Sequence, residues 1–184
     1  QMTPNEDECV AMPDASTLRI CPWDRRFAWF AADLLYVGAV PFDHCTRSIL
    51  KAQVAKAAEQ GLAMNLGVEV EFFAFKPESL ERSDGYLVPL ARSGQLNPTP
   101  AYDVEVAMDA MAFLEPMAKA LDEANFGLFS FDTEGGDAQY EFDFTYAPVL
   151  EMADRVTFFR LMTKQIAKQA GLIATFMPKP YTGS

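Results

Sequence analysis

The chain has 184 residues, with 15 Lys and Arg against 26 Asp and Glu, which gives a formal net charge of −11 at pH 7. Hydrophobic residues make up 50% and aromatic residues 12%, which is enough apolar material for a packed core and excludes a disordered acidic tail. An acidic chain without runs of Lys or Arg carries the wrong field for phosphate backbones or anionic lipid, so we expect neither nucleic acid nor a membrane as a partner.

Short strands and a helix are predicted in the first third of the chain. Leu18 to Val40 has the pattern of strand, turn, strand, turn. The apolar stretch from Phe27 to Phe42 is too short to span a bilayer and carries a central Asp33, so we expect two buried strands there. A helix follows, with Thr46 as its cap and Gly61 just beyond its end.

The middle of the chain alternates between strand, loop and helix signals. From Met64 to Phe75, apolar and acidic residues alternate with period 2, which predicts a strand with two unlike faces. Residues Lys76 to Ala101, rich in Gly and Pro, are expected to form a long loop or hairpin, and loops of that length are often functional. A helix is predicted from Asp103 to about Asn125, with a kink at Pro116.

The last third adds two strands and a long helix. The predicted segments are an apolar run at Leu128–Phe131, a glycine turn at Gly135-Gly136, a strand at Gln139–Phe144, a helix over about Glu151–Ala170 and a terminal strand at Leu172–Met177. Mixed strands and helices with long excursions between them predict an α+β fold.

Cysteine and histidine usage argues against several chemistries. Cys9, Cys21 and Cys45 form an odd set without CxxC spacing, which indicates structural thiols and a reducing, cytoplasmic location. His44 is the only histidine and is expected in a turn, so a histidine-based zinc site or catalytic triad would need residues from elsewhere. The motifs of P-loop, Rossmann, hydrolase-elbow and zincin proteins do not occur in the sequence.

Acidic residues repeat on two of the predicted strands. Glu69 and Glu71 are two residues apart, so both carboxylates project from the same face, about 7 Å apart along the backbone. Gln139, Glu141 and Asp143 repeat the arrangement on a second strand.

Three interpretations of these acids are open. They can be solvated strand faces, which spacing alone favours, or an acid and nucleophile pair for glycoside hydrolysis. Clustered carboxylate oxygens also suit Mg²⁺ or Mn²⁺. Four acids on two strands, with Glu134 just before the glycine turn that feeds the second strand, fit a cation better than a glycoside.

Four segments, taken together and in this order, resemble motifs of the glutamine synthetase family. They are Met12–Thr17 with Cys21–Trp23 (the family's "PD-x-[ST]-T…PW"), Gly67–Phe73 ("G-x-E-x-E-F"), Glu134 with Gln139–Glu141 ("E…GQ-[YFN]-E") and Ala174–Pro180 ("ATFMPKP"). One departure is Ala138, which stands where the family has glycine before Gln139. We expect it to leave Glu141 in register.

The resemblance implies a fold, a domain division and an assembly. The expected fold is the α+β catalytic domain of the family, a largely antiparallel sheet flanked by helices. Residues 43–184 would be its first part, and residues 1–42 the end of an N-terminal β-grasp domain. The family's "GSG-x-H-x-H" element would lie beyond Ser184, so we expect this chain alone to have no ligase activity. Family members form ring homo-oligomers with active sites between subunits.

The resemblance also implies roles for individual residues. Glu71, Glu134 and Glu141 would bind a cation near the substrate glutamate, and Glu69 would bind a second cation that bridges the phosphates of ATP. Tyr102 matches the tyrosine at the ammonium pocket, which Glu134 would also border.

Tyr146 falls where an aromatic residue lies near the nucleotide, with ordinary packing as the open alternative.

The implied activity is ATP-dependent ligation of glutamate with ammonia through γ-glutamyl phosphate, with Mg²⁺ or Mn²⁺. An alternative is the bacterial branch of γ-glutamylmethylamide and γ-glutamylpolyamine synthetases, which the Pro100–Asp103 and Asp132–Glu134 segments resemble. A third possibility, of another class, is a catalytically silent metal-binding or structural relative. Four intact glutamates argue against it, because clustered acids repel one another without a cation.

Overall fold

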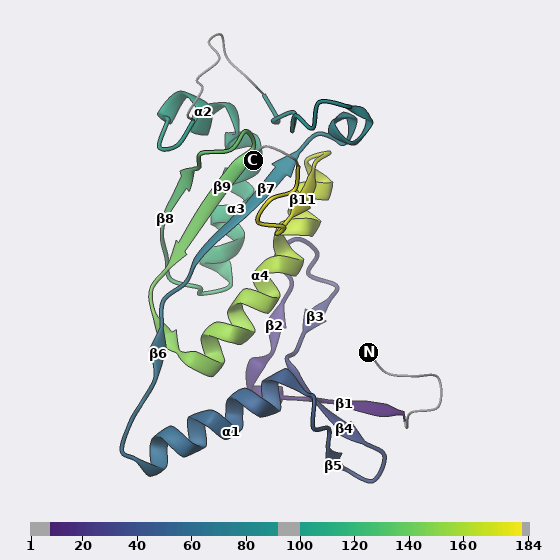
Figure 1. Ribbon diagram of the computed structural model, residues 1–184, viewed down its shortest axis with the longest axis vertical. Coiled ribbons are helices and arrows are strands. Elements are labelled where there is room, and N and C mark those ends of the chain that lie inside the picture. The colour runs from purple at the N-terminus through teal and green to yellow at the C-terminus, as the bar shows by residue number, and fades with distance from the viewer. Residues whose placement is uncertain (1–7, 92–99, 182–184) are drawn as a thin grey trace.

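The computed structural model describes residues 8–91 and 100–181. Figure 1 shows short strands and a helix at one end of the molecule, and a larger sheet with helices packed beside it at the other. No helix in the described part of the chain combines the length and apolarity that a membrane span requires.

The N-terminal end consists of small antiparallel sheets. One sheet has the strand order β1 (Cys9–Pro13), β4 (Ala32–Tyr36), β5 (Val40–Pro41); a second pairs β2 (Arg19–Ile20) with β3 (Ala28–Trp29); and a 3-10 helix covers Ala15–Thr17. The predicted strands around residues 27–42 exist, but the expectation that they are buried is wrong. No residue of β3, β4 or β5 is buried: β4 is half-buried along its length, and Val40 on β5 is exposed, as are Phe27 and Val37 beside these strands. The main core lies around the other sheet, and Trp29 of β3 is only half-buried against it.

Helix α1 (Thr46–Glu59) connects the two ends. Its N-cap is Cys45 rather than the predicted Thr46, and the Cys45 Sγ accepts a hydrogen bond from the backbone N–H of Leu34 at 3.3 Å. Gly61 stands just past the helix end with φ +73°, as its spacing predicted, because this left-handed conformation costs glycine little. No residue of α1 is buried.

The larger sheet lies at the other end of the molecule from β1, β4 and β5 and has four strands. Its strand order is β11 (Ile173–Thr175), β7 (Glu69–Phe75), β9 (Gln139–Phe144), β8 (Leu128–Thr133), and every neighbouring pair is antiparallel. Beside it, β6 (Asn65–Leu66) pairs with β10 (Ala147–Pro148). Strands β8, β9 and β11 and the helix α4 (Val149–Gln169) agree with the predicted segments within a few residues. The strand predicted over Met64–Phe75 is divided into β6 and β7, and β10 was not predicted.

One face of this sheet packs on helices. Apolar side chains from β7 and β9 meet α4 and α3 (Met111–Glu123) in the main core, whose fully buried members include Phe72, Phe113, Met117, Tyr140, Phe142, Phe158, Phe159 and Met162. The other face, which we call the open face, carries the acidic residues of β7 and β9, and farther along β7 it carries Phe73 and Phe75, which pack with Leu87 and Ala138 in a second, smaller cluster. Helices α3 and α4 therefore cover one face, and the loop after β7 covers part of the other.

The segment from Asp103 to Asn125 is two helices rather than one. Helix α2 (Val104–Asp109) ends at Ala110, where α3 begins, and Pro116 lies inside α3 without ending it. α2 buries none of its residues whereas α3 buries five, so the break separates an exposed turn from the core helix. Asp103 caps α2 by accepting hydrogen bonds from the N–H groups of Glu105 and Val106.

The expected long loop after β7 begins with a 3-10 helix, Pro77–Glu81. Part of that expectation, residues 92–99, falls outside the described residues.

Candidate functional site

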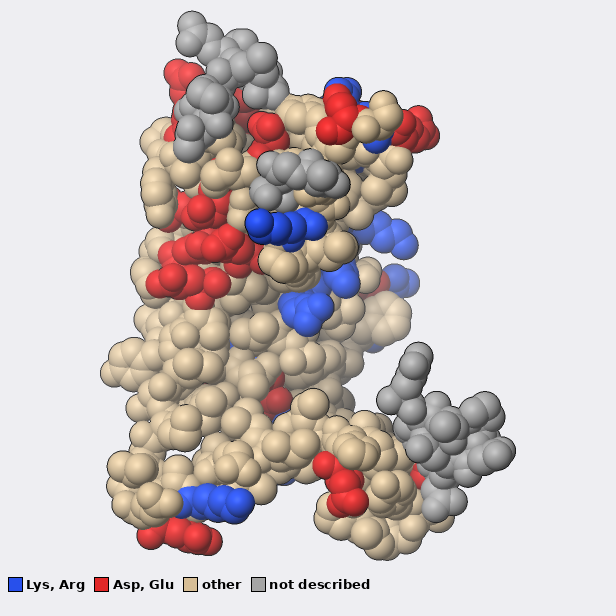
Figure 2. Space-filling view, in the orientation of Figure 1, with Lys and Arg blue, Asp and Glu red and all other residues tan. Residues whose placement is uncertain are grey.

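Carboxylates from three strands lie in register on the open face of the sheet. Glu69 on β7 is opposite Asp143 on β9, and Glu71 is opposite Glu141, which is in turn opposite Asp132 on β8. Residues directly opposite each other in antiparallel strands share a face. The alternating partners on the same strands point into the core instead. Figure 2 shows the acidic side chains gathered over the sheet strands that Figure 1 labels β8 and β9.

The carboxylates of Glu69, Glu71, Asp132, Glu141 and Asp143 form a row across the open face. The turn between β8 and β9 places Glu134 next to this row. The Glu134 N–H donates to the carbonyl of Gln139 at 3.0 Å, which closes the turn. The Gln139 side chain accepts from the N–H of Gly136 at 2.9 Å and donates from Nε2 to Glu71 Oε2 at 2.6 Å. Gly136 leaves no room for a side chain, since a Cβ there would lie 2.8 Å from the ring of Phe73. Gln139 therefore links the turn to the Glu71 carboxylate.

Ala138 adopts the conformation that the family's glycine would favour. Its φ is +61°, in the left-handed region that glycine enters easily and alanine does not, and its side chain is buried. Its carbonyl accepts a hydrogen bond from the N–H of Ala74 at 2.9 Å. Glu141 lies in register opposite Glu71, as expected.

The acids perturb one another. Burial, followed by the charge of Glu71, raises the pKa of Glu134. Burial, together with a hydrogen bond and charge from Asp143 and the charges of Glu134 and Glu71, raises the pKa of Glu141 to about 7. Each cause disfavours the ionised carboxylate, so a bound cation would relieve both groups.

Tyr102 stands beside this row in a left-handed conformation with φ +57°. Its N–H donates to the carbonyl of Thr133 at 2.9 Å, which ties it to the residue before Glu134. The side chain is exposed, and the charge of Glu134, more than burial or the other acids, raises the pKa of its phenol. The structure thus brings Tyr102 and Glu134 together.

Tyr146 lies just beyond β9 and is 73% exposed, with its Cβ 4.0 Å from the position that a Cβ on Gly67 would take. Exposure of this kind does not match ordinary core packing, which was the alternative to a role near the nucleotide. That role stays a prediction.

The donor set on the open face has the chemistry that Mg²⁺ and Mn²⁺ prefer, which is carboxylate oxygen. Glu71, Glu134 and Glu141 perturb one another directly, and Glu69 lies two residues before Glu71 on β7. Within residues 8–91 and 100–181, no three His, Cys, Asp or Glu side chains already stand in a ligating arrangement. The residues fit a divalent cation in type, and the strand register places Glu69, Glu71 and Glu141 on one face of the sheet.

Sequence reasoning did not identify the contribution of β8. Asp132 and Ser130 lie on the open face opposite Glu141 and Asp143, with a register shift between Leu128 and Ser130. The signal that could have found them is the alternation of Ser130 and Asp132 with Phe131 and Thr133, which point to the other face.

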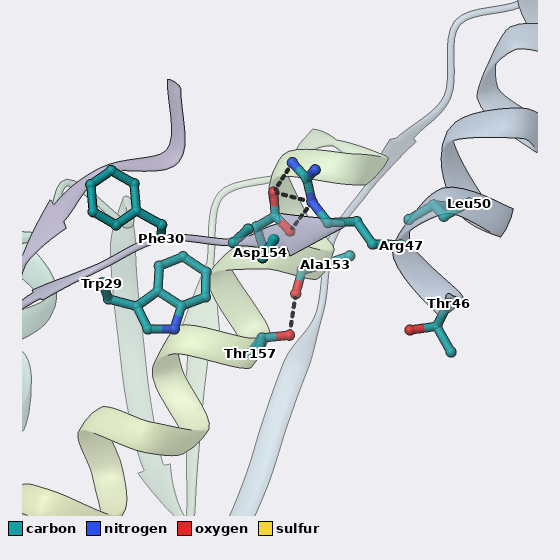
Figure 3. A pocket seen from close by; sticks show the side chains of 10 residues that line it. Trp29, Phe30, Thr46, Arg47, Leu50, Ala153, Asp154 and Thr157 are labelled. Atoms are coloured by element: carbon teal, nitrogen blue, oxygen red, sulfur yellow. Dashed lines mark hydrogen bonds and ion pairs between the residues drawn. The ribbon is translucent and has the colours of Figure 1, made fainter. Parts of the chain in front are cut away.

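A separate cavity of about 420 Å³ lies between the N-terminal strands, α1 and α4. Figure 3 shows Arg47 and Asp154 paired in its wall, near Trp29 and Phe30. The guanidinium of Arg47 also pairs with Asp14 at 2.8 Å and Asp33 at 3.0 Å. None of the acids of the open face lines this cavity, so it is distinct from the candidate site.

Comparison with known proteins identifies the family. The model of the family described as "Glutamine synthetase, catalytic domain" matches residues 43–184. The chain belongs to the glutamine synthetase family. The α+β, antiparallel fold predicted from the sequence resemblance is thereby confirmed, as a partial form of that domain.

Curated relatives include two kinds of ligase. The chain is 35% identical over 182 residues to the glutamine synthetase of Rhizobium meliloti (strain 1021), covering 99% of this chain and 40% of the relative. It is 34% identical over 182 residues to the glutamate–methylamine ligase of Methyloversatilis universalis, covering 98% of this chain and 40% of the relative. The chain thus spans about two fifths of the length of these relatives.

Solved structures agree with this relationship. A GmaS/ADP complex superposes with a TM-score of 0.86 at 33% identity, over 98% of this chain and 40% of that one. GmaS without ligand gives a TM-score of 0.87 at 32% identity, over 99% and 41%.

Proposed function

We propose that the whole protein joins glutamate to ammonia in an ATP-dependent reaction that passes through γ-glutamyl phosphate. The observation that carries the proposal is the register of Glu71, Glu141 and Asp132 across three strands, with Glu134 and Tyr102 at its edge. A structural sheet has no need for carboxylates that raise one another's pKa, whereas a phosphoryl-transfer site needs anions that hold cations.

The cation sites would follow the strands. Glu71, Glu134 and Glu141 would hold one Mg²⁺ or Mn²⁺ and Glu69 a second, and such cations neutralise the charge of transferring phosphoryl groups. Gln139 would hold the Glu71 carboxylate in place through the 2.6 Å hydrogen bond from its amide.

The amine would enter beside Glu134 and Tyr102. An anionic pocket attracts ammonium, and a carboxylate whose pKa is raised accepts a proton more readily than an ordinary one. Glu134 would therefore take the proton that the attacking amine must lose, while Tyr102 stands within the field of the same carboxylate. Tyr146, exposed next to the row, would lie near the nucleotide.

A second candidate is a ligase that uses methylamine in place of ammonia. The 34% identity with the glutamate–methylamine ligase and the close superposition on GmaS structures support it. The two candidates share the phosphoryl-transfer half of the reaction and differ only in the amine.

We also propose the wider organisation that the family resemblance implies. Residues 1–42 would end a β-grasp domain and residues 43–184 would open the catalytic domain, in a ring homo-oligomer. The start of the family match at residue 43 supports this division. Three free cysteines support a reducing cytoplasmic location.

The test is phosphate release from ATP by the whole protein, with glutamate and either ammonia or methylamine. We expect release that requires both glutamate and an amine, and the amine with the higher kcat/KM decides between the candidates. Glu134→Gln should lose at least 100-fold in kcat/KM, on the order of a lost general base. Glu59→Gln on α1 is the matched control. Mn²⁺ binding without turnover would instead support the catalytically silent relative.

A further inference from the structure

Asp143 is a buried carboxylate with one oxygen unsatisfied. The residue is 9% exposed, and its Oδ1 is buried with no hydrogen-bond partner among the described residues. Its Oδ2 accepts a hydrogen bond from the Ser130 hydroxyl at 2.5 Å. Burying an anionic oxygen without a donor is unfavourable, so an unsatisfied oxygen of this kind indicates a missing donor or cation.

The neighbours of Asp143 on its own face supply a donor only while protonated: Glu141 shares a hydrogen bond with Asp143, and such a bond between two carboxyl groups needs a proton on one of them. Glu69 lies opposite it on β7, and Glu141 lies two residues before it on β9. Both are carboxylates and, when ionised, accept hydrogen bonds only. Ser130, opposite on β8, is already engaged with the other oxygen and fixes the orientation of the group.

We propose that Asp143 is a further carboxylate of the cation site, acting on the cation that Glu69 binds. With a cation bound, the Asp143 carboxylate would accept a hydrogen bond from a water ligand of that cation, and Ser130 would hold the carboxylate in place through the hydrogen bond to Oδ2. Mg²⁺ and Mn²⁺ retain water ligands when only one or two protein carboxylates bind them, and those waters are strong donors. The inference rests on the proposed function, because Glu69 is the assumed ligand.

The experiment measures Mn²⁺ binding to the whole protein by calorimetry and by the electron paramagnetic resonance signal of free Mn²⁺, without ATP or glutamate. Asp143→Asn keeps the size of the side chain and an oxygen toward Ser130 but removes the charge. We expect it to weaken Mn²⁺ binding about 10- to 100-fold, the usual loss when a group that supports a metal ligand is changed. Asp122→Asn, an exposed Asp on α3, is the control for the loss of one charge.

Ser130→Ala tests the orientation separately. We expect a smaller loss in the same direction, and no additional loss when the change is made in the Asp143→Asn background, because Ser130 acts only through Asp143. Thermal unfolding without cation controls for folding. Asp143→Asn should unfold no earlier than the unchanged protein, since it removes repulsion from Glu69 and Glu141, but should gain less stability from added Mn²⁺.

The outcomes separate the inference from the proposed function. Mn²⁺ binding by Asp143→Asn within twofold of the unchanged protein, or an equal loss in Asp122→Asn, overturns the inference alone. A folded protein that binds no Mn²⁺ before any change overturns both. If the Asp143→Asn effect holds while no amine supports phosphate release, the cation role stands and the ligase proposal fails.

Discussion

The backbone N–H of Tyr102 is tied to the carbonyl of Thr133 by a 2.9 Å hydrogen bond. The Thr133 hydroxyl makes two further hydrogen bonds to the same segment: it donates to the carbonyl of Pro100 at 2.8 Å and accepts from the N–H of Asp103 at 3.2 Å. Thr133 is 2% exposed, so water cannot replace these hydrogen bonds. The position of Tyr102 beside Glu134 therefore depends on one buried side chain at the end of β8.

Replacing Thr133 by Val keeps its shape and removes the hydroxyl. The Pro100 carbonyl and the Asp103 N–H then lose a partner, and we expect the free energy of unfolding to fall by about 1–3 kcal/mol. Urea denaturation measures it. Thr133→Ser keeps the hydroxyl and should retain most of that stability. Equal losses in both variants would assign the effect to packing rather than to the hydrogen bonds.

Ala138→Gly should relieve the left-handed backbone before Gln139. Alanine at φ +61° is strained by about 1–2 kcal/mol relative to its preferred conformations, and glycine removes this strain. Glycine also lowers the free energy of unfolding by about 0.4–1 kcal/mol, because it gives the unfolded chain more conformational freedom. We expect a net gain of about 0.5 kcal/mol in the free energy of unfolding, measured by urea denaturation. Ala138→Val, branched at Cβ, should destabilise the fold. A loss of stability in Ala138→Gly would show that the buried methyl group matters more than the strain.

Cation binding should depend on pH through Glu141, whose pKa is raised to about 7. The cation needs the ionised carboxylate, so Mn²⁺ affinity should fall by about tenfold for each pH unit below 7 and level off above it. Calorimetry in two buffers of different ionisation enthalpy measures the proton released. Glu141→Gln should bind more weakly, without this pH dependence.

The same raised pKa fixes the sign of the stability change without cation. The pKa of Glu141 in the folded chain lies above its ordinary value of 4.5, so its contribution to stability is present below about pH 4.5 and is lost as the pH rises through about 7. Unfolding midpoints between pH 4.5 and 8 should therefore decline in the unchanged protein more than in Glu141→Gln. Parallel profiles would contradict the assignment.

Arg47 should contribute much of the attachment between the N-terminal strands and α4. Its side chain is 10% exposed and pairs with Asp14, Asp33 and Asp154. Arg47→Met leaves three carboxylates without their shared partner and should cost about 3–5 kcal/mol, measured by urea denaturation. Arg47→Lys should recover part of that loss, because one ammonium cannot serve three carboxylates. Lys56→Met on the exposed side of α1 is the control, and equal effects would contradict the role of Arg47.

Acid should weaken the same group of ion pairs. Hydrogen bonds from Ser16 and Arg47 lower the pKa of Asp14 to about 2. Its contribution to stability is thus present above about pH 4 and is lost as the pH falls toward 2, and Arg47→Met should flatten this part of the profile.

The strands of the candidate site could be predicted from the sequence because period 2 has a direct physical cause. Alternating Glu and apolar residues in Glu69–Phe75 define two faces without further information. The pairing of Glu71 with Glu141 could not be predicted in this way, because register depends on turn geometry and on contacts between distant segments. The role of Thr133 was hidden for the same reason, since its partners lie about 30 residues away.

The errors at the N-terminal end have a different origin. An apolar run from Phe27 to Phe42 indicates burial only if another layer covers it, and sequence alone does not show which layers exist.

The break between α2 and α3 at Ala110 was not predicted from the sequence either. Pro116 is the residue that normally disrupts a helix, yet the change from an exposed turn to a core helix occurs where burial begins.

The strands that carry the candidate site also carry the main core, so packing of the core fixes the positions of the carboxylates. On β9, each acidic residue of the open face alternates with an aromatic residue that the helices cover. A slip of β9 by one residue would turn Phe142 and Phe144 into water and drive Glu141 and Asp143 into the core at the same time. A chain with this mispaired register would therefore be unstable, so the folded protein carries its carboxylates in one register only.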